Sequence, residues 1–318
     1  MPGAPAVSVV CATYRRPQAA ARLLAALEKQ DLDVPFEVVL SDDGSGTDVL
    51  AALRTAVADC RVPVRLLEHS ANRGAASARN DAVQAATAPI IAFTDDDCQP
   101  SKQWLSAGLE ALAADSMVVG RVQPDPAQAD RSGPFSRTLR VEDARFFQTA
   151  NVFYRRSDVL AVGGFDPTLV HGGEDTDLGL RIRELGRAVR FAPDALVLHD
   201  VRPGRARDLA TESLHRWVDL PLVVKKHPQL RRTLAHRRVF WKPSHPPTLL
   251  AVIGLCLAPV FPPLILLTAP WLRFRTRVQR PATMGHGRLS VLAGTFLVDA
   301  AELIACARGS VRHRSLLL

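Results

Sequence analysis

The sequence predicts a doubly wound α/β domain followed by a helical region of different composition. Short apolar runs recur between residues 7 and 93, and a helical pattern separates each run from the next. Apolar runs without polar alternation indicate strands buried on both faces, as in a parallel sheet covered by helices. After about residue 201 the pattern changes, because arginines cluster around a long stretch that has no charge.

Strands and helices alternate strictly in the first part of the chain. The expected strands are Val7–Ala12, Phe36–Leu40, Val64–Leu67 and Ile90–Phe93. The expected helices are Pro17–Lys29, Val49–Ala58 and Ala75–Ala86. In such a Rossmann-like, mostly parallel sheet, ligands bind beyond the carboxyl ends of the strands. Residues that directly follow a strand are therefore the first candidates for function.

After Trp104 the alternation weakens, although the domain continues. The remaining expected elements are the strands Met117–Val122 and Asn151–Tyr154, the helix Glu174–Leu185 and the strand Ala195–Leu198. We place the end of the α/β domain after this last strand. It therefore comprises residues 1–201, and residues 202–318 form a second, basic and helical region.

A hydrophobic segment, residues 243–272, lies in the second region. It contains no Asp, Glu, Lys or Arg, and it is long enough for a membrane helix. Three prolines in its middle would break a straight helix: Pro259, Pro262 and Pro263. Basic residues flank it on both sides: Arg237, Arg238 and Lys242 before it, and Arg273, Arg275, Arg277 and Arg280 after it. They favour a re-entrant hairpin over a single crossing, which stays the alternative.

The last helix expected, residues 289–307, is amphipathic. Its apolar face consists of Leu289, Leu292, Phe296, Ala300 and Leu303. A narrow polar stripe beside that face contains Thr295, Asp299 and Glu302. This pattern predicts a helix lying in a membrane interface, and the alternative is a core helix of a second soluble domain.

Composition limits the possible partners and the compartment. The 318 residues are 47% hydrophobic and carry a formal net charge of +8, which excludes a disordered chain and favours an acidic partner. We expect no nucleic acid, because the basic residues surround hydrophobic segments and aromatics make up only 6%. Five distant cysteines without a CxxC pair indicate neither zinc nor a disulfide framework. We therefore expect the protein to be located at the cytoplasmic face of the cell membrane.

The strongest chemical motif is Thr94-Asp95-Asp96-Asp97, directly after the fourth strand. Three adjacent carboxylates repel one another unless a cation lies among them. Their oxygens suit Mg²⁺ or Mn²⁺, which would then bridge to a diphosphate. An acidic surface turn is the alternative.

A second acidic motif, Ser41-Asp42-Asp43-Gly44-Ser45, follows the second strand. A carboxylate at this place can accept a hydrogen bond from a base N–H or a ribose hydroxyl, although ordinary turn chemistry explains the motif as well. Arg79, in the third helix, could reach a phosphate.

Glycines precede a paired carboxylate later in the chain, in Gly163-Gly164-Phe165-Asp166 and in Gly172-Gly173-Glu174-Asp175. Ionised acids are stabilised at a helix start by the helix dipole, so one of the pair could act as a general base. Helix capping is the alternative. His199, after the last strand, could complete a metal site.

Taken in order, these motifs and Ala12-Thr13-Tyr14-Arg15-Arg16 resemble the family 2 glycosyltransferases, which are inverting enzymes of the GT-A fold. The resemblance covers residues 7–201 and implies a role for each motif. The nucleotide would be bound by residues at the strand ends and in the third helix: Thr13, Tyr14, Arg15, Asp42, Asp43, Arg79, Asp95 and Asp96. Asp97 would be the direct metal ligand, with Asp95 and His199 beside it. Asp175 would be the base, with Glu174 as its rival.

The resemblance implies metal-dependent transfer of a sugar from a nucleoside-diphosphate sugar to an acceptor hydroxyl, with inversion. Asp42 does not determine the donor base, because uracil, thymine and guanine all offer an N–H. The donor that we expect is a UDP-sugar. The hydrophobic region suggests a lipid- or glycan-linked acceptor in cell-envelope glycan, glycolipid or polysaccharide synthesis. The alternative function is a membrane-attached nucleotidyl- or phosphoryl-transferase that uses the same acidic metal site.

Overall fold

The computed structural model describes residues 3–233, 236–278 and 287–318. The chain divides into two compact units. The α/β unit consists of the residues up to 130 together with 138–170 and 174–201, and the helical unit consists of 131–137, 171–173 and 202–318. Two short excursions of the chain therefore belong to the helical unit, although they precede residue 201 in the sequence.

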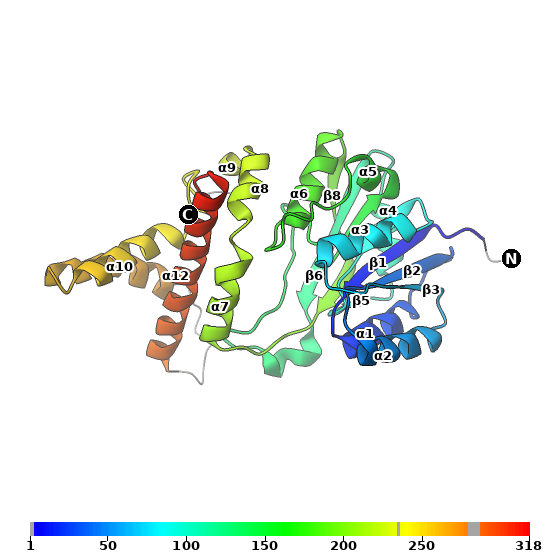
Figure 1. Ribbon diagram of the computed structural model, residues 1–318, viewed down its shortest axis with the longest axis horizontal. Helices are drawn as coiled ribbons and strands as arrows, with labels where there is room; N and C mark the ends of the chain where they lie inside the picture. Colours follow the sequence, from blue (N-terminus) through cyan, green and yellow to red (C-terminus); the bar gives the residue numbers. More distant parts are fainter. Residues whose placement is uncertain (1–2, 234–235, 279–286) are drawn as a thin grey trace. The chain divides into compact units, whose positions relative to one another are not determined.

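Eight strands form one mixed sheet in the α/β unit (Figure 1), in the order β3-β2-β1-β4-β7-β6-β8-β5. Their bounds are β1 Val7–Thr13, β2 Phe36–Asp42, β3 Val64–Glu68, β4 Ile90–Phe93, β5 Cys98–Pro100, β6 Ser116–Pro124, β7 Val152–Arg155 and β8 Ala188–His199. Strands β1 to β4 pair in parallel, as the sequence predicts. In the other half, β7 runs antiparallel to both β4 and β6.

The change from a parallel to a mixed sheet follows the loss of strand–helix alternation after β4. Parallel neighbours require a long crossover, usually a helix, whereas antiparallel neighbours do not. Strand β5 was not predicted, because it has only three residues and one of them is Pro100. Strand β8 begins earlier than expected, at Ala188, and its first residues alternate in burial.

Helices cover both faces of the sheet. Their bounds are α1 Pro17–Leu27, α2 Thr47–Ala58, α3 Ala75–Ala85, α4 Trp104–Ala111, α5 Arg156–Ala161 and α6 Glu174–Glu184. Figure 1 shows α1 and α2 on one side of the parallel strands and α3 on the other. Val9, Leu23 and Leu40 are fully buried between these layers. Apolar burial on both faces explains why β1 and β2 lack polar alternation.

The helical unit is built around its last helix. Its elements are α7 Ala206–Arg216, α8 Leu220–Lys226, α9 Leu230–Thr233, α10 His245–Leu257, the 3₁₀ helix η2 Pro262–Thr268, α11 Ala269–Val278 and α12 Arg288–His313. Helix α12 packs against α7, α8 and α10. Among the described residues, α12 is the one helix long and apolar enough to cross a membrane.

Residues 243–272 do not form one continuous helix. Helix α10 ends at Leu257, and η2 folds back onto it so closely that a Cβ on Gly254 would lie 2.6 Å from the carbonyl oxygen of Leu264. This segment therefore has the hairpin geometry that its prolines favour, and we call α10, η2 and α11 the apolar hairpin. Arg280, one of its expected flanking cations, lies outside the described residues.

The polar stripe of α12 faces inward. Asp299 is 2% exposed and accepts a hydrogen bond from Trp271 Nε1 at 2.8 Å. Glu302 is 7% exposed and accepts hydrogen bonds of 2.7 Å from Lys242 Nζ. A helix lying in a membrane interface would turn such a stripe toward water, so within this unit α12 is packed as a core helix.

Candidate active site

The register of the parallel strands brings the strand-end residues together. Thr13, at the end of β1, lies beside Asp42, at the end of β2, and β4 is the other neighbour of β1. Thr13 Oγ1 donates a hydrogen bond of 2.7 Å to Asp96 Oδ2. The motifs after β1 and β4, more than 80 residues apart, therefore share one buried site.

Two arginines form ion pairs with the three adjacent carboxylates. Arg79 Nη2 lies 2.7 Å from Asp95 Oδ1. Arg16 pairs with both other acids, through Nη2 to Asp96 Oδ1 at 2.8 Å and Nη1 to Asp97 Oδ2 at 3.0 Å. Sequence reasoning assigned no role to Arg16, and its only signal was its place three residues after Thr13.

Asp96 is the most deeply buried of these acids, with 1% of its surface exposed. Burial raises the pKa of Asp96 to about 6, although Arg16 and Thr13 act in the opposite direction. A carboxylate whose charge is this costly gains from a further cation nearby. The electrostatics of the strand end thus favour binding of positive charge.

Asp97 and His199 form a pair that fits a divalent cation. His199 Nδ1 lies 2.8 Å from the carbonyl oxygen of Asp200, which can only accept, so Nδ1 carries the proton. In the neutral imidazole Nε2 then carries the lone pair, and it lies 3.6 Å from Asp97 Oδ1. Because one donor is an imidazole nitrogen, this set suits Mn²⁺ better than Mg²⁺.

Cys98 lies in the same cluster, where its sulfur, Asp97 and His199 have ligand atoms within 4.8 Å of one another. Burial raises the pKa of the Cys98 thiol well above its usual value, and hard cations such as Mg²⁺ and Mn²⁺ prefer oxygen ligands to sulfur. Asp95, which was predicted to reach the metal, is directed to Arg79 instead. Among the described residues, Asp97 and His199 are therefore the better candidates for holding a divalent cation.

The predicted base lies at the start of α6. Asp175 Oδ1 accepts a hydrogen bond of 2.6 Å from the Thr176 N–H. Burial, and then the neighbouring charge of Glu174, raise the pKa of Asp175 to about 7. We expected the helix start to favour the ionised form, but burial and Glu174 outweigh it. A carboxylate with this pKa is well matched to proton removal near neutral pH.

Arg79 joins the acidic stretch to α6. It is 7% exposed, and its Nη1 lies 3.3 Å from Glu174 Oε1 while its Nη2 pairs with Asp95. Burial alone would lower the pKa of Arg79, but Asp95 and Glu174 raise it above its usual value. The structure thus places Arg79 between two carboxylates, where it holds the metal-side acids close to the candidate base.

The Gly163-Gly164-Phe165-Asp166 loop is tied to the same helix as Arg79. Asn80 Oδ1 accepts a hydrogen bond of 2.7 Å from Phe165 N–H, and Asn80 Nδ2 donates one of 2.9 Å to Phe165 O. Gly164 has φ +73°, and a Cβ there would lie 2.3 Å from Asn80 Oδ1. The loop sets the Phe165 ring against the Arg79 guanidinium, 5.8 Å from its centroid. Sequence reasoning missed this contact of Asn80 with Phe165.

The two aspartates after β2 have different partners. Asp42, fully buried, accepts hydrogen bonds from the N–H of Ser45, at 2.9 Å, and from its hydroxyl. Asp43 accepts from the backbone N–H groups of Arg73, at 2.8 Å, and Gly74, at 2.9 Å. Asp43 therefore anchors the loop that precedes α3, while Asp42 shapes its own turn beside Thr13.

Tyr14 and Arg15 directly follow the last residue of β1, Thr13. The Arg15 guanidinium lies over the Tyr14 ring, 5.0 Å from its centroid. Arg15 has a left-handed φ of 55°, and its N–H donates a 2.7 Å hydrogen bond to Ser45 Oγ. This contact locks the turn after β1 against the turn after β2.

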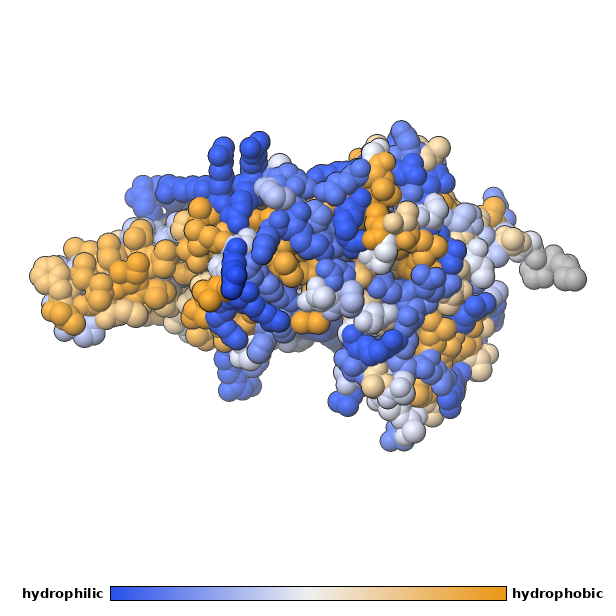
Figure 2. Space-filling model, turned by 45° about the horizontal axis from the view of Figure 1, so that its top comes forward, coloured by the Kyte–Doolittle hydropathy of each residue, from blue (hydrophilic) through white to orange (hydrophobic). Residues whose placement is uncertain are grey.

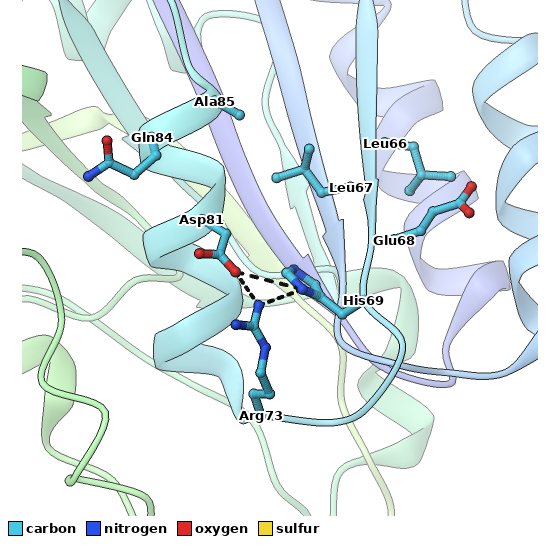
Figure 3. Close-up of a pocket in the computed structure, with 8 residues that line it drawn as sticks. All are labelled: Leu66, Leu67, Glu68, His69, Arg73, Asp81, Gln84 and Ala85. Atoms are coloured by element: carbon cyan, nitrogen blue, oxygen red, sulfur yellow. Dashed lines mark hydrogen bonds and ion pairs between the residues drawn. The ribbon is translucent and has the colours of Figure 1, made fainter.

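A shallow pocket of about 690 Å³ lies beside the edge strand β3. Figure 3 shows Arg73 and His69 directed toward Asp81 within it. Its lining residues are Leu66, Leu67, Glu68, His69, Arg73, Asp81, Gln84 and Ala85. The carboxylates after β2 and β4 and at the start of α6 do not line this pocket, so it is distinct from the site built above.

The mixed sheet with its acidic strand ends has the architecture of the GT-A fold. The chain belongs to glycosyl transferase family 2, whose profile matches residues 8–165. A second profile, that of glycosyl transferase family group 2, matches residues 130–276.

Individual relatives agree with this assignment. Pre-mycofactocin glycosyltransferase of Mycobacterium tuberculosis is 30% identical over 208 residues, which are 61% of this chain and 43% of that protein. The chain thus matches less than half the length of this relative.

Two solved structures share the fold. Mannosyltransferase PcManGT from Pyrobaculum calidifontis, in complex with GDP-Man and Mn²⁺, has a TM-score of 0.60 at 20% identity, covering 98% of this chain and 88% of that one. TarS of S. aureus, in complex with UDP-GlcNAc, has a TM-score of 0.51 at 16% identity, and the match covers 97% of this chain and 92% of that one.

Proposed function

We propose that this chain transfers a sugar from a nucleoside-diphosphate sugar to an acceptor hydroxyl with inversion, aided by a divalent cation. One observation carries the proposal: Arg79 joins Asp95 of the acidic stretch to Glu174 at the start of α6. One side chain thereby ties the acidic stretch that contains Asp97 to the carboxylate pair that contains the candidate base. Family membership and this geometry point to the same chemistry.

Asp97 and His199 would hold the cation, whose chemistry is to neutralise the charge of the departing diphosphate. Thr13, Asp42 and Asp96 would bind the nucleoside, because their buried oxygens can pair with a base N–H and ribose hydroxyls. The complexes of the two structural neighbours contain GDP-Man with Mn²⁺ and UDP-GlcNAc. We expect a UDP-sugar here, with a GDP-sugar as the alternative.

Asp175 would remove the proton from the acceptor hydroxyl. As that proton moves to the carboxylate, the acceptor oxygen forms a bond to the anomeric carbon, and the bond from that carbon to the diphosphate oxygen breaks. Attack opposite the leaving group inverts the configuration in one displacement. Glu174 is less suited to this role, because Arg79 already pairs with its carboxylate.

The acceptor that we propose is a lipid- or glycan-linked hydroxyl used in cell-envelope glycan, glycolipid or polysaccharide synthesis. Its support is the helical unit, where the apolar hairpin exposes side chains such as Val260 and Leu266 to solvent. An enzyme attached to a membrane meets acceptors that are anchored there.

The test measures binding and turnover with UDP-, GDP- and dTDP-sugars, with and without Mn²⁺. Asp97→Ala should lose Mn²⁺-dependent donor binding, and Asp175→Asn should keep binding but lose turnover. Asp59→Asn, at an exposed carboxylate on α2's carboxyl end, is the matched control and should behave as wild type. Release of a nucleoside monophosphate instead of a diphosphate would indicate nucleotidyl or phosphoryl transfer and overturn the proposal.

A further inference from the structure

The apolar hairpin exposes more hydrophobic surface than packing within its unit requires. The exposed fractions are 86% for Val260, 57% for Phe261 and 72% for Leu266. Others on the same hairpin are Leu250, Ile253, Leu255, Leu257, Ile265 and Leu272. In Figure 2 the surface over α10 and its neighbours is a continuous hydrophobic patch. Apolar patches of this extent mark binding surfaces.

Buried polar contacts anchor the base of the hairpin to α12. Arg275, in α11, pairs with Asp299 through two nitrogens, and Trp271 packs edge-on against Phe296 at 5.1 Å between ring centroids. Lys242, just before α10, pairs with Glu302. The two ends of the hairpin are thus both anchored to α12. Among the described residues, those at its turn make no comparable contact.

Cations flank the hydrophobic segment in the sequence and are absent from its middle. Arg237, Arg238, Arg273 and Arg277 are exposed. Between Lys242 and Arg273 the sequence has no Asp, Glu, Lys or Arg. An apolar tip flanked by exposed arginines complements a bilayer whose headgroups carry negative charge, because each cation near such a surface adds about 1 kcal/mol of attraction.

The hairpin is too short to cross a bilayer. Helix α10 has 13 residues, which at 1.5 Å each span about 20 Å, less than the hydrocarbon core of about 30 Å. Helix α12 is longer, but Asp299 and Glu302 lie in its middle, and carboxylates are costly at membrane depth. The hairpin, and not a crossing by α12, is therefore the element suited to contact lipid.

We propose that the apolar hairpin inserts tip-first into one leaflet of an anionic phospholipid bilayer, with its flanking arginines at the headgroups. Because it enters and leaves on one side, both arginine clusters stay on the same face, which the charge bias of membrane proteins makes the cytoplasmic face. This inference does not depend on the proposed function, since its tests measure binding to lipid and not sugar transfer.

The first test is flotation of the full chain with vesicles of phosphatidylcholine, alone or mixed with phosphatidylglycerol. Wild type should float with the anionic vesicles, and high salt should weaken this binding by screening the arginines. Val260→Asp should lower the vesicle-bound fraction about tenfold, because a carboxylate enters hydrocarbon poorly. Val311→Asp is the matched control, since Val311 is 82% exposed but lies on α12 outside the hairpin.

Two results would overturn the proposal. One is flotation of Val260→Asp like wild type, and the other is an equal loss in Val311→Asp. If wild type does not float but forms a dimer that Val260→Asp dissociates, the hairpin binds a second copy of the chain instead. Circular dichroism of each variant checks that the fold is retained.

The second test uses a native cysteine as a reporter. Cys256, on α10, is exposed, whereas Cys60, after α2, is half-buried in the α/β unit. Anionic vesicles should protect Cys256 from a membrane-impermeant maleimide and leave labelling of Cys60 unchanged. Unchanged labelling of Cys256 on vesicle-bound protein would contradict insertion of the hairpin.

Discussion

The core of the helical unit and the candidate active site of the α/β unit hold carboxylates in opposite ways. In the helical unit, Asp299 is enclosed by Trp271 and Arg275, so its charge is matched by fixed donors. In the α/β unit, burial raises the pKa of Asp96 and of Asp175 despite their local partners. A buried carboxylate is therefore structural where fixed donors stabilise its charge. It is a candidate for function where its pKa is raised, because a cation or a proton would then stabilise it.

The units differ equally in their apolar residues. The strands of the α/β unit enclose theirs between two helix layers, and Val9, Leu40 and Phe93 are fully buried. The apolar hairpin exposes most of its own to solvent. The strands of the α/β unit thus bury their hydrophobic side chains inside the unit, whereas the apolar hairpin presents a hydrophobic surface that lipid can cover.

The largest effect should come from Asp175→Asn. We expect kcat to fall about 10³-fold with donor affinity unchanged, because an amide cannot accept the acceptor's proton. Steady-state kinetics and donor titration measure the two quantities. Glu174→Gln, which alters the neighbour paired with Arg79, should lower kcat much less, and the reverse order would make Glu174 the base.

The contrast between structural and functional acids can be tested by stability. Asp299→Ala should lower the free energy of unfolding by about 3–5 kcal/mol, because Arg275 and the Trp271 N–H would lose their buried acceptor. Asp97→Ala should change it by less than about 1 kcal/mol, since its repulsion with Asp96 is also removed. Urea denaturation measures both, with Asp299→Asn as the conservative control. Equal losses for Asp97→Ala and Asp299→Ala would remove the distinction.

A pH profile tests the raised pKa of Asp175. Because the base must be ionised, kcat/KM should rise about tenfold per pH unit below about pH 7 and level off above it. The folded pKa lies above the ordinary value of 3.8, so this group's stabilising contribution is fully present below about pH 4. It is lost as the pH rises through about 7, and Asp175→Asn should remove this loss. A rate profile without a step near neutral pH would contradict the assignment.

The smallest effect concerns Arg16, which bridges Asp96 and Asp97. Its guanidinium competes with a cation for Asp97, so Arg16→Ala should tighten Mn²⁺ binding about three- to tenfold in the absence of donor. Titration followed by electron paramagnetic resonance measures this affinity. Arg16→Lys should fall between wild type and Arg16→Ala, and weaker Mn²⁺ binding in Arg16→Ala would show that Arg16 instead supports the site.

The local elements of the α/β unit were predictable because short apolar runs and helical periodicity are properties of neighbouring residues. Strands β1 to β4 and helices α1 to α3 agree with the prediction to within a few residues at each end. Strand β5 and helix α4 were missed, since three residues in a strand and eight in a helix leave little periodic pattern. The same limit hid the partner of Asn80, because its contact with Phe165 spans 85 residues.

The sequence by itself determined the family, the order of the acidic motifs and the break of the hydrophobic segment at its prolines. Only the tertiary structure decided which charges meet: Arg79 with Asp95 and Glu174, Arg16 with Asp96 and Asp97, and the stripe of α12 with Arg275 and Lys242. The physical reason is that propensity and periodicity act between neighbours along the chain. Burial and pairing of charge depend on which distant segments the sheet register and helix packing bring together.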